Sequence, residues 1–173
     1  MKRIFSFSVP LALSILILVS CDKEPNVSGE VELFLLESFA TLDQTCAIDQ
    51  SAAVLKNEPL ISYSEFSSYN SEKYVFTISD KAALAVENLE HSVFGLPFAV
   101  VADHEIAYTG YFWPAYSSLG CQWIVIDPLM WQGKNELHVV LGYPGPLEGS
   151  EISDERNNQL IIDIFNRDGK LID

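Results

Sequence analysis

Basic residues, cysteine and histidine are scarce in this chain of 173 residues. It carries 10 Lys and Arg against 24 Asp and Glu, for a formal net charge of -14, with 3 Cys and 3 His. A nucleic-acid surface needs clustered Lys and Arg, so the charge argues against a nucleic-acid partner. The cysteines and histidines are too few for a disulfide scaffold or a zinc array. The 49% hydrophobic content nevertheless predicts one folded domain with a substantial core.

Motifs of nucleotide, metal and nucleophile chemistry are also missing. The sequence has no glycine-rich phosphate loop, no EF-hand pattern and neither Gly-x-Ser-x-Gly nor Ser-x-x-Lys. Ser117 and Ser118 are typical of a turn, and the histidines lack metal-ligand spacing, including His104, the most exposed candidate. We expect no enzyme, no cofactor and no metal, with one alternative, weak calcium binding by an acidic loop cluster of Glu148, Glu151, Asp154 and Glu155.

The first twenty residues form a targeting segment. Lys2 and Arg3 precede an apolar run from Ile4 to Val19, which is the pattern of a secretory signal peptide. The run Leu18-Val19-Ser20-Cys21 looks like the lipobox of bacterial lipoproteins, in which the cysteine after the cleavage site carries the lipid. A transmembrane anchor and a plain secreted signal are the alternatives. The resemblance implies lipidation at Cys21 and attachment to the membrane through the lipid.

This resemblance also implies a domain organisation and a location. Residues 1–20 are expected to be the lipoprotein signal peptide, 21–29 the lipidated cysteine with a polar tether, and 30–173 a single domain. The acidic residues after Cys21 resemble the export signal of Bacteroidetes surface lipoproteins, and the chain resembles small uncharacterised lipoproteins of that group. The expected location is the bacterial cell envelope, at the outer membrane, on either its periplasmic or its surface face.

The domain is predicted to be α+β. Ser79 and Ser153 each look like the N-cap of a helix, the first ended by Gly95 and the second running through Phe165 toward Gly169. Asp103-His104 predicts a tight turn between two strands. Apolar runs and alternation predict strands over residues 31–36, 74–78, 98–102, 105–112, 123–126 and 137–141. The economical arrangement is a mixed, mainly antiparallel sheet with two helices on one face.

Residues 58–112 resemble a known module. The segments Tyr74-Val75-Phe76-Thr77-Ile78-Ser79-Asp80 and Ser92-Val93-Phe94-Gly95-Leu96-Pro97-Phe98-Ala99-Val100-Val101-Ala102-Asp103-His104 are similar to the first periplasmic head domain of SecD. The resemblance implies a ferredoxin-like, SecD head-like fold and brings no catalytic residues. After Trp113 the chain departs from the family pattern, and the predicted mature domain lacks the transmembrane helices with which SecD moves protons.

Two further features of the predicted domain are a pair of cysteines and a cluster of aromatic residues. Cys46 and Cys121 remain after Cys21 is lipidated, and they form either a disulfide, which the exported location favours, or two buried thiols. Strand alternation places Tyr108 and Phe112 on one face and Tyr111 and Trp113 on the other. The favoured interpretation is that these aromatic side chains pack in the core. If a binding face exists instead, its candidate residues are Tyr111, Trp113, Tyr116 and Trp123.

These observations support two candidate functions of different kinds. The first is a noncatalytic, lipid-anchored domain that binds another envelope protein through its sheet face or the loop from 113 to 122. The alternative is a small-ligand or glycan-binding lipoprotein that uses the aromatic cluster. A hydrolase ranks third, because no nucleophile is paired with a base.

Overall fold

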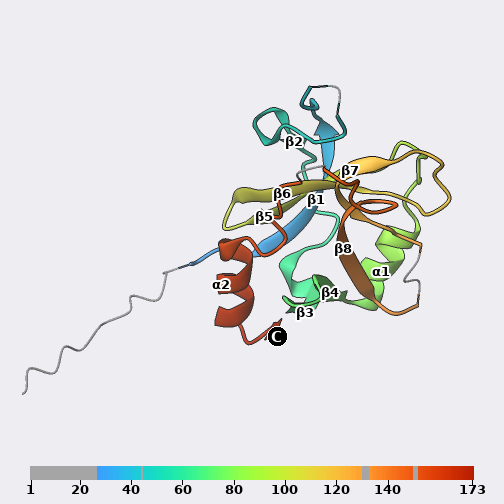
Figure 1. Ribbon diagram of the computed structural model, residues 1–173. Helices are drawn as coiled ribbons and strands as arrows, with labels where there is room; N and C mark the ends of the chain where they lie inside the picture. Colours follow the sequence, from blue (N-terminus) through green and yellow to red (C-terminus); the bar gives the residue numbers. More distant parts are fainter. Residues whose placement is uncertain (1–26, 44, 130–132, 150–151) are drawn as a thin grey trace, which may run out of the picture.

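A computed structural model describes residues 27–43, 45–129, 133–149 and 152–173 (Figure 1). The expected signal peptide, Cys21 and most of the tether lie outside these residues. The elements, in chain order, are β1 (Val31–Ser38), the 3-10 turn η1 (Gln50–Ala52), β2 (Val54–Leu55), the 3-10 turn η2 (Tyr63–Glu65), β3 (Phe66–Asn70), β4 (Val75–Ile78), α1 (Asp80–Glu87), β5 (Leu96–Ala102), β6 (Glu105–Phe112), β7 (Cys121–Ile126), β8 (Glu136–Tyr143), α2 (Gln159–Arg167) and β9 (Leu171–Ile172).

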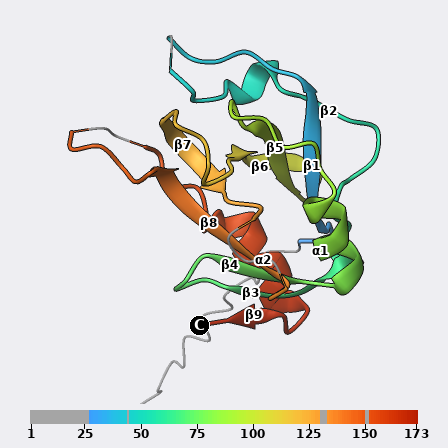
Figure 2. The ribbon, with the colours of Figure 1, turned by 90° about the vertical axis from the view of Figure 1, so that its right-hand side faces the viewer.

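The strands form one mixed sheet, in the order β2-β1-β5-β6-β7-β8-β4-β3-β9. The β6·β7 and β3·β9 pairs are parallel and the other pairs antiparallel, so the expected α+β class with a mainly antiparallel sheet is confirmed at that level. The sheet bends at β8. Glu136 to His138 pair with β4, and the following residues of β8 pair with β7, so the two halves of the sheet face each other (Figure 2).

The larger hydrophobic cluster fills the space between these halves. Buried residues of α1 (Ala82, Val86) and α2 (Ile161, Ile164, Phe165) belong to this one cluster, so both helices lie on the inner face of the sheet. They lie at opposite ends of it in Figure 1. Phe165 is fully buried among aromatic rings, with centroids 5.7 to 6.1 Å away. Helix propensity alone would leave such short helices marginal, so this packing stabilises them.

The predicted hairpin at Asp103-His104 is confirmed. The turn joins β5 to β6, and both turn residues have positive φ, 50° and 68°, as a two-residue hairpin of right-handed twist requires. The N-cap of α1 is also confirmed, because the Ser79 hydroxyl accepts a hydrogen bond from the Ala82 amide. Local sequence patterns were sufficient at both positions.

The predicted end of α1 at Gly95 is wrong. The helix ends at Glu87 with Asn88 as its C-cap, and the chain then forms a separate turn in which the Gly95 amide donates to Ser92 O. Gly95 has φ +75°, and a Cβ atom there would lie 2.5 Å from the Trp113 ring. The glycine therefore serves the close approach of Trp113 rather than the helix end.

The predicted start of α2 at Ser153 is also wrong. Asn158 is the N-cap, and its side-chain oxygen accepts a hydrogen bond from the Leu160 amide. Ser153 donates its hydroxyl to Glu155 instead. Arg156 pairs with Asp154 and donates to Val139 O, and these contacts hold the segment in an irregular conformation against β8.

Two smaller differences from expectation lie at Tyr74 and at Val27. Tyr74, expected to begin a strand, has φ 56° and precedes β4, and its ring centroid lies 3.5 Å from the Arg156 guanidinium. Val27 packs against the core, and the Arg167 guanidinium donates to Val27 O and Gly29 O. The last residues assigned to the tether are therefore held by the domain.

Candidate functional site

The four aromatic residues proposed as a binding face do not share one exposed surface. Tyr111 and Trp113 are only 4% and 5% exposed and form an edge-to-face pair with centroids 5.9 Å apart. Burial raises the pKa of Tyr111 to about 12. Trp123 is partly buried, and its indole N–H donates to the Thr109 hydroxyl. Tyr116 alone among the four is largely exposed, at 58%. A single face built from all four is therefore ruled out.

A second hydrophobic cluster explains this burial. Tyr111, Trp113 and Val125 lie on the outer face of the sheet, opposite Tyr108 and Phe112, as the alternation predicts. The segment from Phe39 to Ala53, which the sequence left unassigned, covers them. Its Ile48 is buried in the cluster, and Cys46 forms a disulfide with Cys121 of β7, with Cα atoms 5.7 Å apart. The aromatics thus belong to a core held closed by a covalent bond.

Three chain segments without charge meet at one end of the molecule. Residues 92–97, 113–121 and 140–147 contain no Asp, Glu, Lys or Arg. The Ser117 hydroxyl donates to Val93 O at 2.7 Å, which joins the first segment to the second. The Tyr143 hydroxyl donates to Ala115 O at 2.6 Å, which joins the second to the third. We call this surface the charge-free end.

The charge-free end also gathers exposed apolar side chains. Of the eleven large hydrophobic residues that are exposed in the described part of the chain, six lie on it. Phe94 is the most exposed of them, at 71%. These six residues are Val93, Phe94, Tyr116, Leu119, Val140 and Leu147. Exposed apolar side chains that gather on one part of a surface are typical of a binding surface, especially where charge is depleted.

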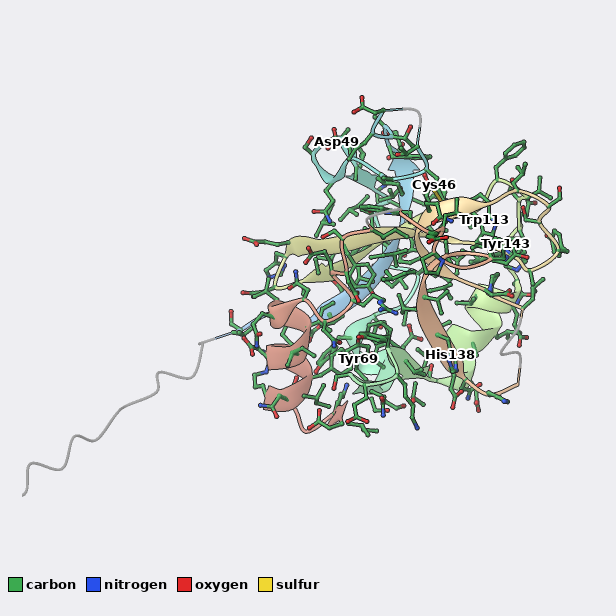
Figure 3. The ribbon with its side chains drawn as sticks, viewed as in Figure 1. Cys46, Asp49, Tyr69, Trp113, His138 and Tyr143 are labelled. Carbon is green, nitrogen blue, oxygen red and sulfur yellow. A yellow bond between two sulfur atoms is a disulfide. The ribbon has the colours of Figure 1, made fainter. Side chains whose placement is uncertain are left out.

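An apolar groove of about 370 Å³ opens on the same end. Val125 and Val140 contribute from β7 and β8, Trp113 lines one side, and the turn that follows β8 brings Tyr143 and Pro144. The side chains of Trp113 and Tyr143 lie on this side of the molecule in Figure 3. Gln122 supports the turn, because its amide group donates to Gly145 O and accepts from the Leu147 amide. The groove is large enough for one or two apolar side chains.

Polar groups stand at one end of the groove. Asp127 follows β7, and its Oδ1 accepts from the Leu129 amide. Its Oδ2 is shielded from solvent and accepts no hydrogen bond from the described residues. His138 also lines the groove and pairs with Glu136, with Nε2 and Oε2 2.9 Å apart. An apolar groove lined by one carboxylate, with a second carboxylate paired to its histidine, can hold an apolar side chain beside a cation.

A second cavity, of about 460 Å³, is more polar. It lies where β6 and β7, which pair over only two residues on each strand, separate from each other. Trp123 lines it together with Asp49, Glu155 and Asn158. This cavity is the place where the alternative function, ligand binding by an aromatic residue, has a structural basis.

Two of the residues considered for catalysis or metal binding, Ser117 and Asp154, make structural contacts. The Ser117 hydroxyl donates to Val93 O and accepts from the Leu119 amide, so it organises the loop. His104 lies in the β5–β6 turn, and Asp154 of the acidic cluster pairs with Arg156, while Glu151 lies outside the described residues. Within the described ranges, no three His, Cys, Asp or Glu side chains gather to hold a metal. Neither described helix is long and apolar enough to cross a membrane.

Comparisons with known proteins give no relative for this chain. No protein-family model matches it, and no match was found among the curated proteins or the solved structures. Its function must therefore be argued from its own residues.

Tyr116 and Trp113 were predicted from the sequence as candidate binding residues, whereas Phe94, Val140 and Tyr143 were not. The signal that could have found them is charge. In so acidic a chain, three uncharged segments of six or more residues with large apolar side chains stand out. Aromatic clustering drew attention to β6 instead, where the rings pack inside.

Proposed function

We propose that this chain is a lipid-anchored, noncatalytic domain of the bacterial cell envelope that binds another envelope protein through the charge-free end. The exposed apolar surface of this end is the observation that carries the proposal. Protein interfaces are depleted of charge at their centre and rich in aromatic residues, and this end has both properties. Of the two binding surfaces expected, the structure favours the loop from 113 to 122 over the sheet face, since the sheet face is buried under the Cys46 segment.

The envelope location and the anchor rest on the sequence. The lipobox-like run before Cys21 supports lipidation, and the acidic residues that follow it support an outward-facing domain. The resemblance of residues 58–112 to the SecD head domain supports a noncatalytic role and a ferredoxin-like substructure, and both stay predictions. Mass analysis of the mature protein for a diacylglycerol on Cys21 tests the anchor directly.

The binding proposal is tested by comparing matched surface variants of the full chain. Phe94→Ser with Tyr116→Ser removes two apolar side chains of the charge-free end. Val54→Ser removes one of 48% exposure on β2, which β1, β5 and β6 separate from β7 in the sheet. After solubilisation of membranes in detergent, the wild type and Val54→Ser should recover the same partner, and the double variant should lose it. Recovery of the bait alone by the wild type, or equal recovery by all three, overturns the proposal.

Glycan or small-ligand binding in the cavity lined by Trp123 is the second candidate. Its support is the partly exposed indole beside polar groups, an arrangement suited to stacking on a sugar ring. Trp123→Ala should then abolish binding in a glycan array and leave partner capture unchanged. A Trp123→Ala variant that keeps its glycan signal, or a wild type with none, removes this candidate.

A further inference from the structure

The charges that surround the charge-free end are mostly of one sign. Asp127 lies at the groove, and Glu136 pairs with its neighbour His138. Glu90 precedes His91, whose carbonyl oxygen accepts a hydrogen bond from the Tyr116 hydroxyl, and Glu148 follows the exposed Leu147. Among the described residues, Lys134 in the turn before β8 contributes a positive charge to this region. The apolar surface is therefore bordered by carboxylates.

These carboxylates decide which kind of binding partner fits the apolar surface. A second copy of the chain would bring the same carboxylates against their counterparts, and like charges across an interface are unfavourable. An anionic lipid surface would be repelled for the same reason. A partner with positive charge beside its apolar residues complements the surface in both respects.

Asp127 gives this complementarity a particular position. Its Oδ2 is buried without a hydrogen-bond donor among the described residues, at the end of a groove whose other lining is largely apolar. A buried carboxylate oxygen without a donor is costly, and the cost is removed when a donor is supplied. A Lys or Arg next to an apolar residue that enters the groove places a positive charge beside this carboxylate and offsets part of that cost through charge attraction, without contact with the shielded Oδ2.

We propose that the charge-free end binds a basic partner segment in which an apolar side chain fills the groove and an adjacent Lys or Arg pairs with Asp127 and Glu136. This inference rests on the proposed function and adds the chemistry of the partner. It assigns two tasks to different residues. Phe94, Tyr116 and the groove provide apolar contact, and the carboxylates choose the sign of the partner's charge.

The test uses the full chain in detergent and three labelled peptides, with binding followed by fluorescence anisotropy. The first peptide combines Leu and Phe with Lys, the second replaces each Lys with Gln, and the third keeps Lys but replaces the apolar residues with Gly. The first should bind most tightly. Its advantage over the second should shrink when salt is raised from about 50 mM to about 500 mM, because salt screens the charges.

Variants of the chain then assign the contacts. Asp127→Asn and Glu136→Gln should each weaken binding of the Lys peptide by about threefold, within the range of a partly exposed ion pair, and should leave the Gln peptide unaffected. Glu58→Gln, an exposed carboxylate between β2 and η2, is the matched control and should change nothing. Phe94→Ser with Tyr116→Ser should weaken both peptides that carry apolar residues.

Three results would overturn the inference: equal binding of the Lys and Gln peptides, an Asp127→Asn effect no larger than that of Glu58→Gln, or binding of the Gly peptide as tight as that of the first. The last result would mean attraction to the overall charge of -14 rather than to this surface. The membrane capture experiment keeps the two proposals distinct. If Phe94 and Tyr116 are needed for capture and the peptides show no preference for Lys, the proposed function stands and the partner chemistry is wrong.

Discussion

Removal of the disulfide should lower the stability of this domain by several kcal/mol. The bond between Cys46 and Cys121 spans 75 residues. On the chain-entropy account, a closed loop of this length stabilises the folded state by about 4 kcal/mol. Cys46→Ala with Cys121→Ala removes this constraint and releases the Phe39 to Ala53 segment from the cluster around Tyr111.

Urea unfolding followed by tryptophan fluorescence and circular dichroism measures the effect. With a denaturant slope of about 2 kcal/mol per molar, the midpoint should fall by about 2 M in the double alanine variant. A dithiol reductant should lower the wild-type midpoint by a similar amount and leave the variant unchanged, which separates loss of the bond from loss of the sulfur atoms. A midpoint that neither the substitutions nor the reductant moves would refute this reasoning, because the segment would then be held by its apolar contacts alone.

Three further changes test the fold. Phe165→Ala should lower the free energy of unfolding by about 3 to 5 kcal/mol in a urea titration, because a fully buried ring is lost. Asn158→Ala should cost about 1 kcal/mol in the same titration by removing the N-cap of α2, whereas Ser153→Ala should be nearly neutral. Hydrogen bonds from Arg167 and Tyr63 hold the pKa of Asp168 well below its usual range, so its carboxylate stabilises the fold above the unfolded pKa of about 3.9 and loses this effect as the pH falls. Thermal melts of Asp168→Asn between about pH 5 and pH 3 should therefore show a smaller loss of stability than those of the wild type.

Local patterns were enough for the elements whose geometry is set within a few residues. The turn at Asp103-His104 and the cap at Ser79 need only neighbouring side chains and backbone. The alternation along β6 correctly separated Tyr108 and Phe112 from Tyr111 and Trp113. It could not say that both faces of the strand are covered, because the covering segment around Cys46 is far away in the sequence.

The errors at the ends of the two helices have the same physical origin. Ser153 followed by Asp154 and Glu155 has the composition of a helix start, but the Arg156 guanidinium reaches Val139 O and the Tyr69 hydroxyl donates to Arg156 O. These contacts are made between segments distant in the sequence. Gly95 is likewise explained by Trp113 and not by its own helix.

Only part of the candidate site could be predicted from the sequence. The absence of charge in residues 92–97, 113–121 and 140–147 can be read directly from the chain. That these segments meet depends on the parallel β6·β7 pair and on the antiparallel β7·β8 pair, and neither follows from local pattern. The groove exists because strands from separate parts of the chain bring Trp113 and Val140 together.

Photo-cross-linking in living cells tests the central claim, that the charge-free end is the binding surface, most directly. A benzoyl-phenylalanine placed at position 94, 116 or 54 of the full chain reports which protein lies against that side chain. Positions 94 and 116 should give the same discrete adduct with one envelope protein, and position 54 should give none. Adducts absent at 94 and 116, or equally abundant at 54, would contradict the claim.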